Sequence, residues 1–378
     1  MHCRVLAVVG TRPEAIKIAP VVLRLRREPE VFSVVVCATA QHRGLLDSPM
    51  ELFGLRPDID LDLMRPNQGL NEILGRIVSG VDGCLEAQPP DWVLVQGDTT
   101  TVMATALAAF HRRIRVAHVE AGLRTGDLAN PFPEEMNRRV TDLVSTLHFA
   151  PTRRSADRLR AEGVPGNSIH VTGNTVVDAL SWMAATDPTP PPEEKLILIT
   201  SHRRESYGEP MRRAFRAIAS LARRFPDYDF VFPVHPNPSV VAVLDELRQI
   251  GNVRLVEPVD YRQLVKWLRA ARLILTDSGG IQEEAPTFGK PVLVLRDTTE
   301  RPEGIERGVA RLVGTDERRI FEEAERLLTD EKAYAAMARA GNPYGDGRAS
   351  DRIAGLLAGR EVEPFDEQGS PRVLHEDR

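Results

Sequence analysis

The sequence predicts an α/β protein of two doubly wound, Rossmann-like domains that face each other across a cleft. Three observations favour this fold class. Apolar, β-branched runs alternate with segments of helical spacing, the segment DPTPPP (187–192) interrupts this alternation, and the alternation then restarts. In addition, 378 residues exceed what a single hydrophobic core usually serves.

The first domain is predicted to open with a strand over residues 4–9, an apolar run that ends in Gly10 and is followed by helical spacing over 13–27. Strand, glycine turn and helix form the opening unit of a parallel sheet. The same criteria predict further strands at 32–38, 91–95, 114–119, 146–150 and 168–172. Further helices are predicted at 70–85, 99–110 and 153–162, and one more begins at Pro133.

The second domain repeats the alternation. Its strands are predicted at 195–200, 229–233, 253–256, 273–276 and 291–295. Its helices are predicted at 211–224, 239–250, 261–270, 280–288, 319–328 and 331–340. This is the pattern of a second doubly wound parallel sheet.

Composition divides the chain into five segments. Residues 1–175 form the first domain, and 176–192 are a connector because the prolines of DPTPPP cannot continue regular structure. Residues 193–345 form the second domain. A C-terminal helix over 346–360 is expected to pack back on the first domain, and the acidic, aperiodic residues 361–378 are expected to be a mobile tail.

Composition also narrows the class of function. The formal net charge is -5 and no Lys/Arg-rich run is present, so nucleic acid is not expected as a partner. Cys3, Cys37 and Cys84 form no CxxC pair, and no histidines cluster at zinc spacing, so neither a disulfide framework nor a metal is expected. The chain enters a strand at once, without a signal segment, and no run reaches the length of a membrane helix. We therefore expect a cytoplasmic protein with no membrane partner.

Carboxylates concentrate where predicted strands end, above all in residues 118–135, HVEAGLRTGDLANPFPEE. Glu120 directly follows an apolar run, where a charge is expected to be partly buried and to need a partner or a purpose. Asp98 also follows a strand, and Glu134 opens a helix. Ligands bind at the carboxyl ends of parallel strands, so we expect these three acids to meet there and to raise one another's pKa for proton transfer.

Structural roles remain open for two of these acids. Asp98 precedes a helix, where aspartate is a common cap. Glu134 lies in a first helical turn, where the helix dipole favours acids, and Arg138 one turn later is a possible ion-pair partner.

Cationic residues at strand ends are placed to reach an anion. Arg12 follows the first strand in GTRPE, and Lys17 lies one turn into the next helix, although a solvated helix face explains both equally well. His202 follows the first strand of the second domain and is followed by two arginines. Such a histidine tends to stay neutral until an anion binds, which suits phosphate recognition, and an exposed basic turn is the alternative.

The motif TDSGG opens a helix in the second domain and is typical of a pyrophosphate site. Gly279 and Gly280 let a ligand approach the backbone, and Ser278 can cap the helix. Glu284 lies about one turn in, where a carboxylate can accept hydrogen bonds from ribose hydroxyls, and Arg301 follows the next strand. The chain lacks a GxGxxG fingerprint after its first strand and a P-loop, so neither NAD nor ATP is expected.

Taken together, the motifs resemble those of the non-hydrolysing UDP-N-acetylglucosamine 2-epimerases. The resemblance runs in order from Arg4 to about Gly359. It rests on the strings GTRPEAIK (10–17), TAQHR (39–43), GDTTT (97–101), HVEAGLRTGD (118–127), PEE (133–135), TGNTVVDAL (172–180), HRRE (202–205), TDSGGIQEEAP (276–286), GKPVLVLRDTTERPE (289–303) and NPYGDG (342–347).

This resemblance implies a GT-B fold, a homodimer, and a reaction without metal or cofactor that interconverts UDP-N-acetylglucosamine (UDP-GlcNAc) and UDP-N-acetylmannosamine (UDP-ManNAc). In that family UDP is eliminated to leave 2-acetamidoglucal and is re-added after the other face of C2 is protonated. By motif, Asp98, Glu120 and Glu134 would act on the sugar, and His202 would stabilise the leaving UDP. Substrate-binding roles are implied for Arg12, Lys17, Ser278, Gly279, Gly280, Glu284 and Arg301.

The resemblance also implies an allosteric site for a second UDP-GlcNAc, contacted by Gln41, His42 and His235. Gly44 and Pro236 depart from the family pattern beside these residues, where relatives carry a larger polar residue and an apolar one.

Three other functions share features with this sequence. A hydrolysing epimerase would release free N-acetylmannosamine and UDP, but its relatives lack the uninterrupted GDTTT, HVEAGLRT and PEE strings. A GT-B glycosyltransferase shares the fold and the donor site, which do not decide function. A UDP-sugar sensor without activity would need no set of three acids.

Overall fold

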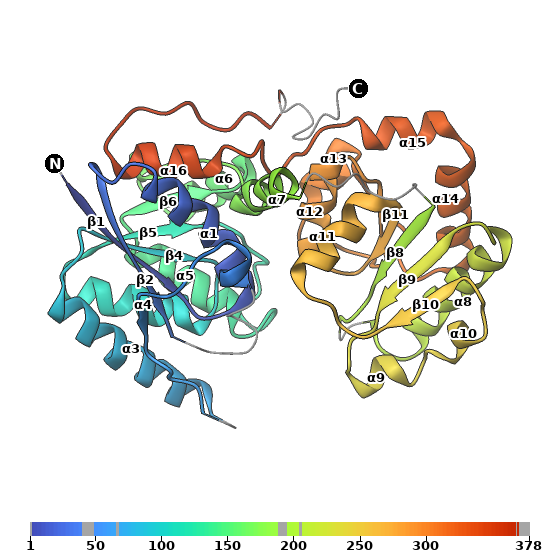
Figure 1. Cartoon of the computed structure of the whole chain (residues 1–378), viewed down its shortest axis with the longest axis horizontal. Coiled ribbons are helices and arrows are strands. Elements are labelled where there is room, and N and C mark those ends of the chain that lie inside the picture. Colours follow the sequence, from blue (N-terminus) through green and yellow to red (C-terminus); the bar gives the residue numbers. More distant parts are fainter. Residues whose placement is uncertain are drawn as a thin grey trace. The chain divides into compact units, whose positions relative to one another are not determined.

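The computed structural model describes residues 2–39, 49–65, 68–187, 195–203, 206–367 and 369. It divides into two compact units: unit 1 is Met1–Trp182 with Gly345–Glu367, and unit 2 is Met183–Tyr344 with Gln368–Arg378. Each unit is an α/β domain built on one parallel sheet (Figure 1). The predicted fold class of two doubly wound α/β domains is confirmed.

The described strands of unit 1 form a seven-stranded sheet of order β3-β2-β1-β4-β5-β6-β7. Their bounds are β1 (Cys3–Val9), β2 (Phe32–Ala38), β3 (Ile59–Asp60), β4 (Trp92–Gln96), β5 (Arg115–Val119), β6 (Leu147–Ala150) and β7 (Ile169–Val171). The chain reverses its direction of travel across the sheet between β1 and β4, and this topological switch point is where such sheets bind ligands.

The helices of unit 1 follow the strands in sequence. Their bounds are α1 (Arg12–Arg26), α3 (Leu70–Ala87), α4 (Thr100–His111), α5 (Glu134–Val144), α6 (Arg153–Ala161), η1 (Gly166–Ser168), α7 (Thr175–Thr186) and α16 (Ala349–Leu357). Leu6 and Val8 of β1 pack in one apolar cluster with Ile77 and Val81 of α3. The intervening residue of β1, Ala7, is also fully buried, so the sheet is covered on both faces and its strand is a continuous apolar run.

Helix α16 comes from the end of the chain and lies against α1 of unit 1 (Figure 1). The buried carboxylate of Asp178 in α7 accepts hydrogen bonds from the backbone N–H groups of Ala349 (3.2 Å) and Ser350 (2.7 Å). These bonds satisfy the amino end of α16, which leaves the last helix of the chain anchored in the first unit.

The described strands of unit 2 form a six-stranded sheet of order β10-β9-β8-β11-β12-β13. Their bounds are β8 (Leu196–Thr200), β9 (Asp229–Pro233), β10 (Val253–Val256), β11 (Ala271–Thr276), β12 (Val292–Val294) and β13 (Ala310–Leu312). The helices are α8 (Glu209–Arg224), α9 (Pro238–Val241), α10 (Asp245–Arg248), α11 (Tyr261–Ala270), α12 (Gly279–Glu284), η3 (Ala285–Phe288), α13 (Pro302–Arg307), α14 (Glu317–Thr329) and α15 (Glu331–Ala338). The switch point of this sheet lies between β8 and β11.

Several elements differ from the sequence-based expectation. The sequence did not reveal β3, β13 and α13, because elements of two to six residues carry too few side chains to show a period. The helix expected over 239–250 is two short helices, α9 and α10, because N–H groups at Val243 and Leu244 bond three residues back and tighten the chain.

Two expected irregular segments are ordered in part. Residues of the predicted connector belong to α7, whose Val176, Val177 and Leu180 are all buried, so the helix has no polar face to give an amphipathic period. The expectation of a mobile tail is wrong for residues 361–367, where Phe365 is 1% exposed and its N–H donates to the carbonyl of Val171 (2.8 Å). In the described ranges, no helix combines the length and the apolar character needed to cross a membrane.

Candidate active site

Three loops at the carboxyl end of the unit 1 sheet bring the predicted acids and their partners together. They follow β1, β4 and β5, which are neighbours in the order β1-β4-β5, so residues distant in sequence end at one edge. The first loop leads to Arg12, the second contains Asp98, and the third begins at Glu120.

Glu120 is a buried carboxylate that contacts three polar side chains. It is 8% exposed, and its φ of 67° lies in the left-handed region that few non-glycine residues adopt. Lys17 donates from Nζ to Oε1 (2.6 Å), Asn174 donates from Nδ2 to Oε1 (3.2 Å), and the amide of Gln96 donates to Oε2. The buried charge therefore has the partner that the sequence argument required, and that partner is Lys17.

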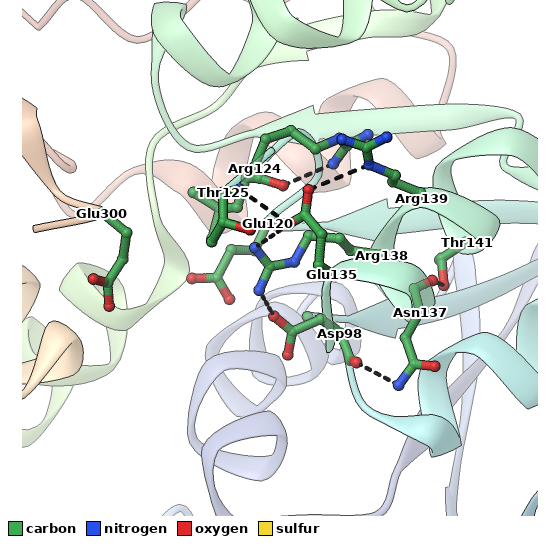
Figure 2. Close-up of polar contacts among 12 residues, drawn as sticks. Asp98, Glu120, Arg124, Thr125, Glu135, Asn137, Arg138, Arg139, Thr141 and Glu300 are labelled. Atoms are coloured by element: carbon green, nitrogen blue, oxygen red, sulfur yellow. Dashed lines mark hydrogen bonds and ion pairs between the residues drawn. The ribbon is translucent and has the colours of Figure 1, made fainter. Parts of the chain in front are cut away.

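Asp98 is held by the helix α5. Its carboxylate pairs with Arg138, and its backbone carbonyl accepts a hydrogen bond from Nδ2 of Asn137 (2.9 Å). Arg138 also pairs with Glu135 (3.1 Å) and lies between the two acids, as Figure 2 shows. Asp98 does not cap the following helix; Thr99 does, by accepting from the N–H of Val102 (3.4 Å).

The two acids that open α5 have different environments. Glu135 is fully buried and accepts hydrogen bonds from the N–H groups of Thr125 (3.0 Å) and Gly126 (3.2 Å). Burial alone would raise the pKa of Glu135, but these N–H groups and the charge of Arg138 hold that pKa below its ordinary value. Glu134 is half-buried, and its carboxylate makes no hydrogen bond or ion pair with the part of the chain that the structure describes. The ion pair considered for Glu134 and Arg138 is thus made by Glu135 instead.

A second layer of buried charges fixes the backbone beside Asp98. His118 is fully buried, shares a hydrogen bond with Asp142 through Nδ1 (2.6 Å) and contacts the carbonyl of Gly97 through Nε2 (2.7 Å). Arg124 pairs with Asp142 (2.8 Å). Burial opposes ionisation of Asp142, but the nearby His118 and Arg124 lower its pKa, so the carboxylate remains charged. The carbonyl just before Asp98 is consequently held in place.

This geometry corrects one expectation about the acids. We expected Asp98, Glu120 and Glu134 to raise one another's pKa for proton transfer, without cations among them. A cation lies against two of these acids, Arg138 against Asp98 and Lys17 against Glu120. Lys17 therefore pairs with the carboxylate of Glu120, whereas Arg12 is exposed at the start of α1, where it is accessible to an anion.

The corresponding edge of unit 2 carries His202. Its side chain is 42% exposed, its ring stacks on that of His235 with centroids 5.8 Å apart, and its Nδ1 lies 3.7 Å from Oδ1 of Asp277. Asp277 is fully buried and accepts hydrogen bonds from the hydroxyl of Ser201 (2.8 Å) and the N–H of His202 (2.9 Å). His202 and His235 are thus neighbours, while Gln41 and His42 lie outside the described residues.

The predicted pyrophosphate motif opens α12. Ser278 is the N-cap residue, but its side chain makes no capping hydrogen bond, so that expected role is not seen. A Cβ on Gly279 would lie 2.8 Å from Oε1 of Glu300, so a larger residue here would displace the end of that side chain. Gly280 follows as the second residue of α12, and Glu284 ends it, half-buried.

Arginines surround the loop after β12. Arg301 pairs with Glu283 of α12. Glu300 accepts hydrogen bonds from Arg203 (3.2 Å) and Arg296 (2.6 Å). Burial alone would raise the pKa of Glu300, but the charges of Arg301, Arg296 and Arg203 lower that pKa to about 2. This edge of unit 2 is therefore rich in guanidinium groups, which suit phosphate recognition.

Sequence reasoning missed several residues of these two edges. They are Glu14, Gln96, Thr99, Arg138, Asn174 and Asp277. Arg138 was considered only as a partner of Glu134, and its contact with Asp98 depends on strand order. Asp277 directly follows a predicted strand and Asn174 stands two residues after one, so the same positional signal was available for them. Within the described ranges, no group of three or more His, Cys, Asp or Glu side chains is arranged to hold a metal ion.

The chain is similar in sequence to known UDP-N-acetylglucosamine 2-epimerases. Residues 24–358 match the family model described as UDP-N-acetylglucosamine 2-epimerase. The UDP-N-acetylglucosamine 2-epimerase of Escherichia coli (strain K12) is 51% identical over 374 residues, which cover 95% of this chain and 99% of that protein.

Solved structures of similar proteins match this chain over both units. The UDP-GlcNAc 2-epimerase from Neisseria meningitidis bound to UDP-GlcNAc is 47% identical with a TM-score of 0.85, and the match covers 94% of this chain and 100% of that one. The UDP-GlcNAc 2-epimerase from Methanocaldococcus jannaschii in complex with UDP-GlcNAc and UDP is 32% identical with a TM-score of 0.80, covering 94% and 99% of the two chains. From the family match and these identities, the chain belongs to the UDP-N-acetylglucosamine 2-epimerase family.

Proposed function

We propose that the protein is a non-hydrolysing UDP-GlcNAc 2-epimerase that interconverts UDP-GlcNAc and UDP-ManNAc and so supplies N-acetylmannosamine units for polysaccharide or amino-sugar biosynthesis. The observation that carries the proposal is the set of acids Asp98, Glu120 and Glu134 at one sheet edge of unit 1. The relative from Methanocaldococcus jannaschii, which was solved with UDP-GlcNAc and UDP, supports the choice of substrate.

The proposed reaction balances without an oxidant or a second substrate. A base removes the proton from C2, the C1–oxygen bond to UDP breaks, and the electron pair from C2 forms the C1=C2 double bond of 2-acetamidoglucal. An acid then protonates the opposite face of C2, and the same UDP oxygen adds back to C1. The two steps need a base and an acid near the sugar and stabilisation of negative charge on the departing diphosphate.

The acids of unit 1 divide the proton transfers at C2 among them. Glu120 stays oriented because Lys17, Asn174 and Gln96 fix its two oxygens. Asp98 is oriented by Arg138 in the same way. Glu134 projects from the start of α5 without an ion pair in the described part of the chain, which leaves its carboxylate available to a sugar. Arg12 is proposed to contact the substrate beside them.

Unit 2 is proposed to bind the nucleotide. His202 is oriented by Asp277 and stabilises the charge that develops on UDP as it leaves. The proposed binding residues are Ser278, Gly279, Gly280, Glu284 and Arg301. Their support is the arginines around the loop after β12 and the pair of glycines that opens α12.

The decisive experiment is incubation with UDP-GlcNAc in heavy water. We expect UDP-ManNAc with deuterium at C2, because the proton removed by the enzyme exchanges with solvent before another is returned. Epimer without deuterium would contradict the elimination route. Free N-acetylmannosamine together with UDP would indicate a hydrolysing enzyme. Turnover that requires an added acceptor would indicate a glycosyltransferase, and binding without turnover would indicate a sensor.

Two further properties of the family are proposed for this chain. We propose that UDP-GlcNAc also binds at an allosteric site that includes His235, which would give a sigmoidal dependence of rate on substrate concentration. We also propose a homodimer, in which the exposed apolar residues Phe110 (55%) and Leu143 (83%) are candidates for burial. Light scattering in solution measures the mass, and a monomer would contradict the second proposal.

A further inference from the structure

One buried acid of unit 1 joins the two loops that flank the switch point. Glu14 lies in the first turn of α1 and is 1% exposed. Its Oε2 accepts a hydrogen bond from the N–H of Gly10 (2.7 Å), at the end of β1. Its Oε1 accepts from the hydroxyls of Thr11 (2.9 Å) and Thr99 (2.7 Å). The carboxylate thus connects the loop after β1 with the loop after β4.

A local explanation accounts for part of this arrangement. Thr11 is the N-cap residue of α1 and Glu14 stands three positions later, which is the spacing of a capping box. This spacing explains why the side chain of Glu14 lies close to Thr11. It does not explain the bond to Thr99, which is 85 residues away, or the complete burial of the carboxyl group.

The distant contact ends directly beside a proposed catalytic acid. Thr99 follows Asp98 and caps α4 by accepting from the N–H of Val102 (3.4 Å). The two loops also approach closely, since a Cβ on Gly10 would lie 2.3 Å from the hydroxyl oxygen of Thr101. The spacing between α1 and the loop of Asp98 is therefore fixed at Glu14 and Thr99.

The same helix reaches a second proposed catalytic acid. Lys17 lies one turn after Glu14 on α1 and pairs with Glu120. A shift of α1 relative to the loop after β4 would consequently move Lys17 and Glu120 relative to Asp98. Reacting groups displaced by about 1 Å can lose about 100-fold in rate.

The environment of Glu14 disfavours a negative charge on its carboxyl group. Among its partners in the described ranges there is no cation, only hydroxyl and N–H donors. Burial raises the pKa of Glu14 to about 7, although the hydrogen bonds from Thr99, Gly10 and Thr11 oppose the rise. The charged residues on the elements that it joins are Arg12, Lys17, Arg24 and Arg26 on α1 and Asp98 before α4.

We propose that Glu14 is a positioning residue for Asp98 that acts through Thr99. It sets the separation between helix α1 and the loop after β4, and with it the relative positions of Asp98 and Glu120. The inference rests on the epimerase function proposed above and assigns Glu14 a role in that reaction without contact to the sugar.

Two double-mutant cycles on the full-length protein, assayed by UDP-ManNAc formation in heavy water, test the proposal. One cycle combines Glu14→Ala with Thr99→Val, and the other combines Glu14→Ala with Thr11→Val. We expect Glu14→Ala and Thr99→Val each to lower kcat about tenfold and to change KM less than about twofold, because binding through unit 2 is untouched. The first double variant should be no slower than its slower parent, whereas the coupling in the second cycle should be weaker, because Thr11 contacts Glu14 but does not adjoin Asp98.

Three further variants separate positioning from stability. Thr99→Ser keeps the hydroxyl and should restore kcat. Thr152→Val removes the equivalent cap of α6, where Thr152 accepts from the N–H of Ser155 (3.2 Å), and should leave kcat unchanged. Asp178→Asn alters another buried acid of unit 1, at α16, and should also leave kcat unchanged. If Glu14→Ala fails to fold, the test rests on the kcat of Thr99→Val compared with the kcat of Thr99→Ser and of Thr152→Val.

The outcomes distinguish this inference from the proposed function. Coupling of Glu14 to Thr11 but not to Thr99, or an equal loss of kcat in Thr152→Val, would overturn the positioning role while the wild-type enzyme still made deuterated UDP-ManNAc. A wild-type protein without turnover would overturn both proposals.

Discussion

The two units share a strand order but build their switch points differently. In unit 1 the loops after β1 and β4 are joined by the carboxylate of Glu14, which accepts from Gly10 and Thr99. In unit 2 the loops after β8 and β11 are joined by the carboxylate of Asp277, which accepts from Ser201 and from the backbone of His202. In both places a buried acid ties one loop to the other across the point where the strand order reverses.

The groups around these two acids differ in kind and exposure. The unit 1 edge presents carboxylates, and Lys17 and Arg138 are engaged with them. The unit 2 edge presents the half-exposed ring of His202 and arginines that pair with Glu283 and Glu300. Under the proposed function, one sheet topology serves proton transfer at one edge and anion recognition at the other, because the short loops and not the strands carry the chemistry.

The largest effect is expected from Glu120→Gln, which tests whether the chemistry belongs to unit 1. The amide cannot exchange a proton with C2 and removes the negative charge that pairs with the partly buried Lys17, so kcat should fall about 100- to 10,000-fold. Binding of UDP by calorimetry should stay within about twofold, since the proposed nucleotide-binding residues lie in unit 2. The matched control is Glu72→Gln, whose carboxylate is 53% exposed on α3. Retained turnover in Glu120→Gln would remove this acid from the mechanism.

The next effect concerns the stability of unit 1. It tests whether the buried, ionised carboxylate of Glu14 at the switch point lowers the free energy of unfolding. The pKa of Glu14 is raised from 4.5 to about 7, so the folded state binds this proton more tightly than the unfolded state. Its contribution to stability is fully present below pH 4.5, declines as the pH rises to about 7, and is lost above that. Relative to Glu14→Gln, the wild-type free energy of unfolding should fall by about 3 kcal/mol between the two limits.

Urea unfolding of the wild type and Glu14→Gln at several pH values measures this difference. Asp178 offers a parallel case in the same unit, because burial raises its pKa from 3.8 to about 6, and Asp178→Asn should show the same trend over a lower pH window. A difference between wild type and Glu14→Gln that does not change with pH would show that Glu14 does not titrate in this range.

A smaller effect is expected from Asp277→Asn, which tests the corresponding acid of unit 2. The amide nitrogen cannot accept the bonds that Ser201 and His202 donate, so His202 loses its orientation and UDP should bind about tenfold more weakly. Titration calorimetry with UDP gives the affinity. Asp229→Asn, at an exposed position of β9 in the same unit, is the control and should bind UDP as the wild type does. Equal affinity for both variants would break the parallel between Glu14 and Asp277.

No effect is expected from metal removal. At neither switch point are three or more His, Cys, Asp or Glu side chains arranged to hold a metal ion, among the residues that the structure describes, and the proposed reaction uses carboxylates and an imidazole instead. Turnover in the presence of excess EDTA should equal that of the untreated enzyme. A loss that added Mg²⁺ or Zn²⁺ reverses would contradict the assignment of the chemistry to side chains alone.

Much of the architecture was predictable because it is local. Strands such as β1 and β5 are apolar runs, and helices such as α8 show a clear apolar stripe, so short windows of sequence reveal them. The helix α7 and the residues near Phe365 were not predictable in this way. Their burial depends on the elements that pack around them, which a window of sequence does not contain.

The candidate acids were also predictable, whereas their partners were not. Asp98 and Glu120 follow predicted strands, and strand ends in a parallel sheet meet at one edge. The ion pair between Lys17 and Glu120 spans 103 residues, and the one between Arg138 and Asp98 spans 40. No periodicity links positions so far apart.

By itself, the sequence determined two alternating domains, acids at the strand ends of the first, and a glycine-rich helix start in the second. Only the tertiary structure decided that Glu135 rather than Glu134 pairs with Arg138, and that Glu14 reaches Thr99 as well as Thr11. The capping-box spacing at Thr11 and Glu14 was visible in the sequence, but the burial of Glu14 was not. Local spacing fixes which backbone elements form, whereas the order of strands in the sheet fixes which side chains meet.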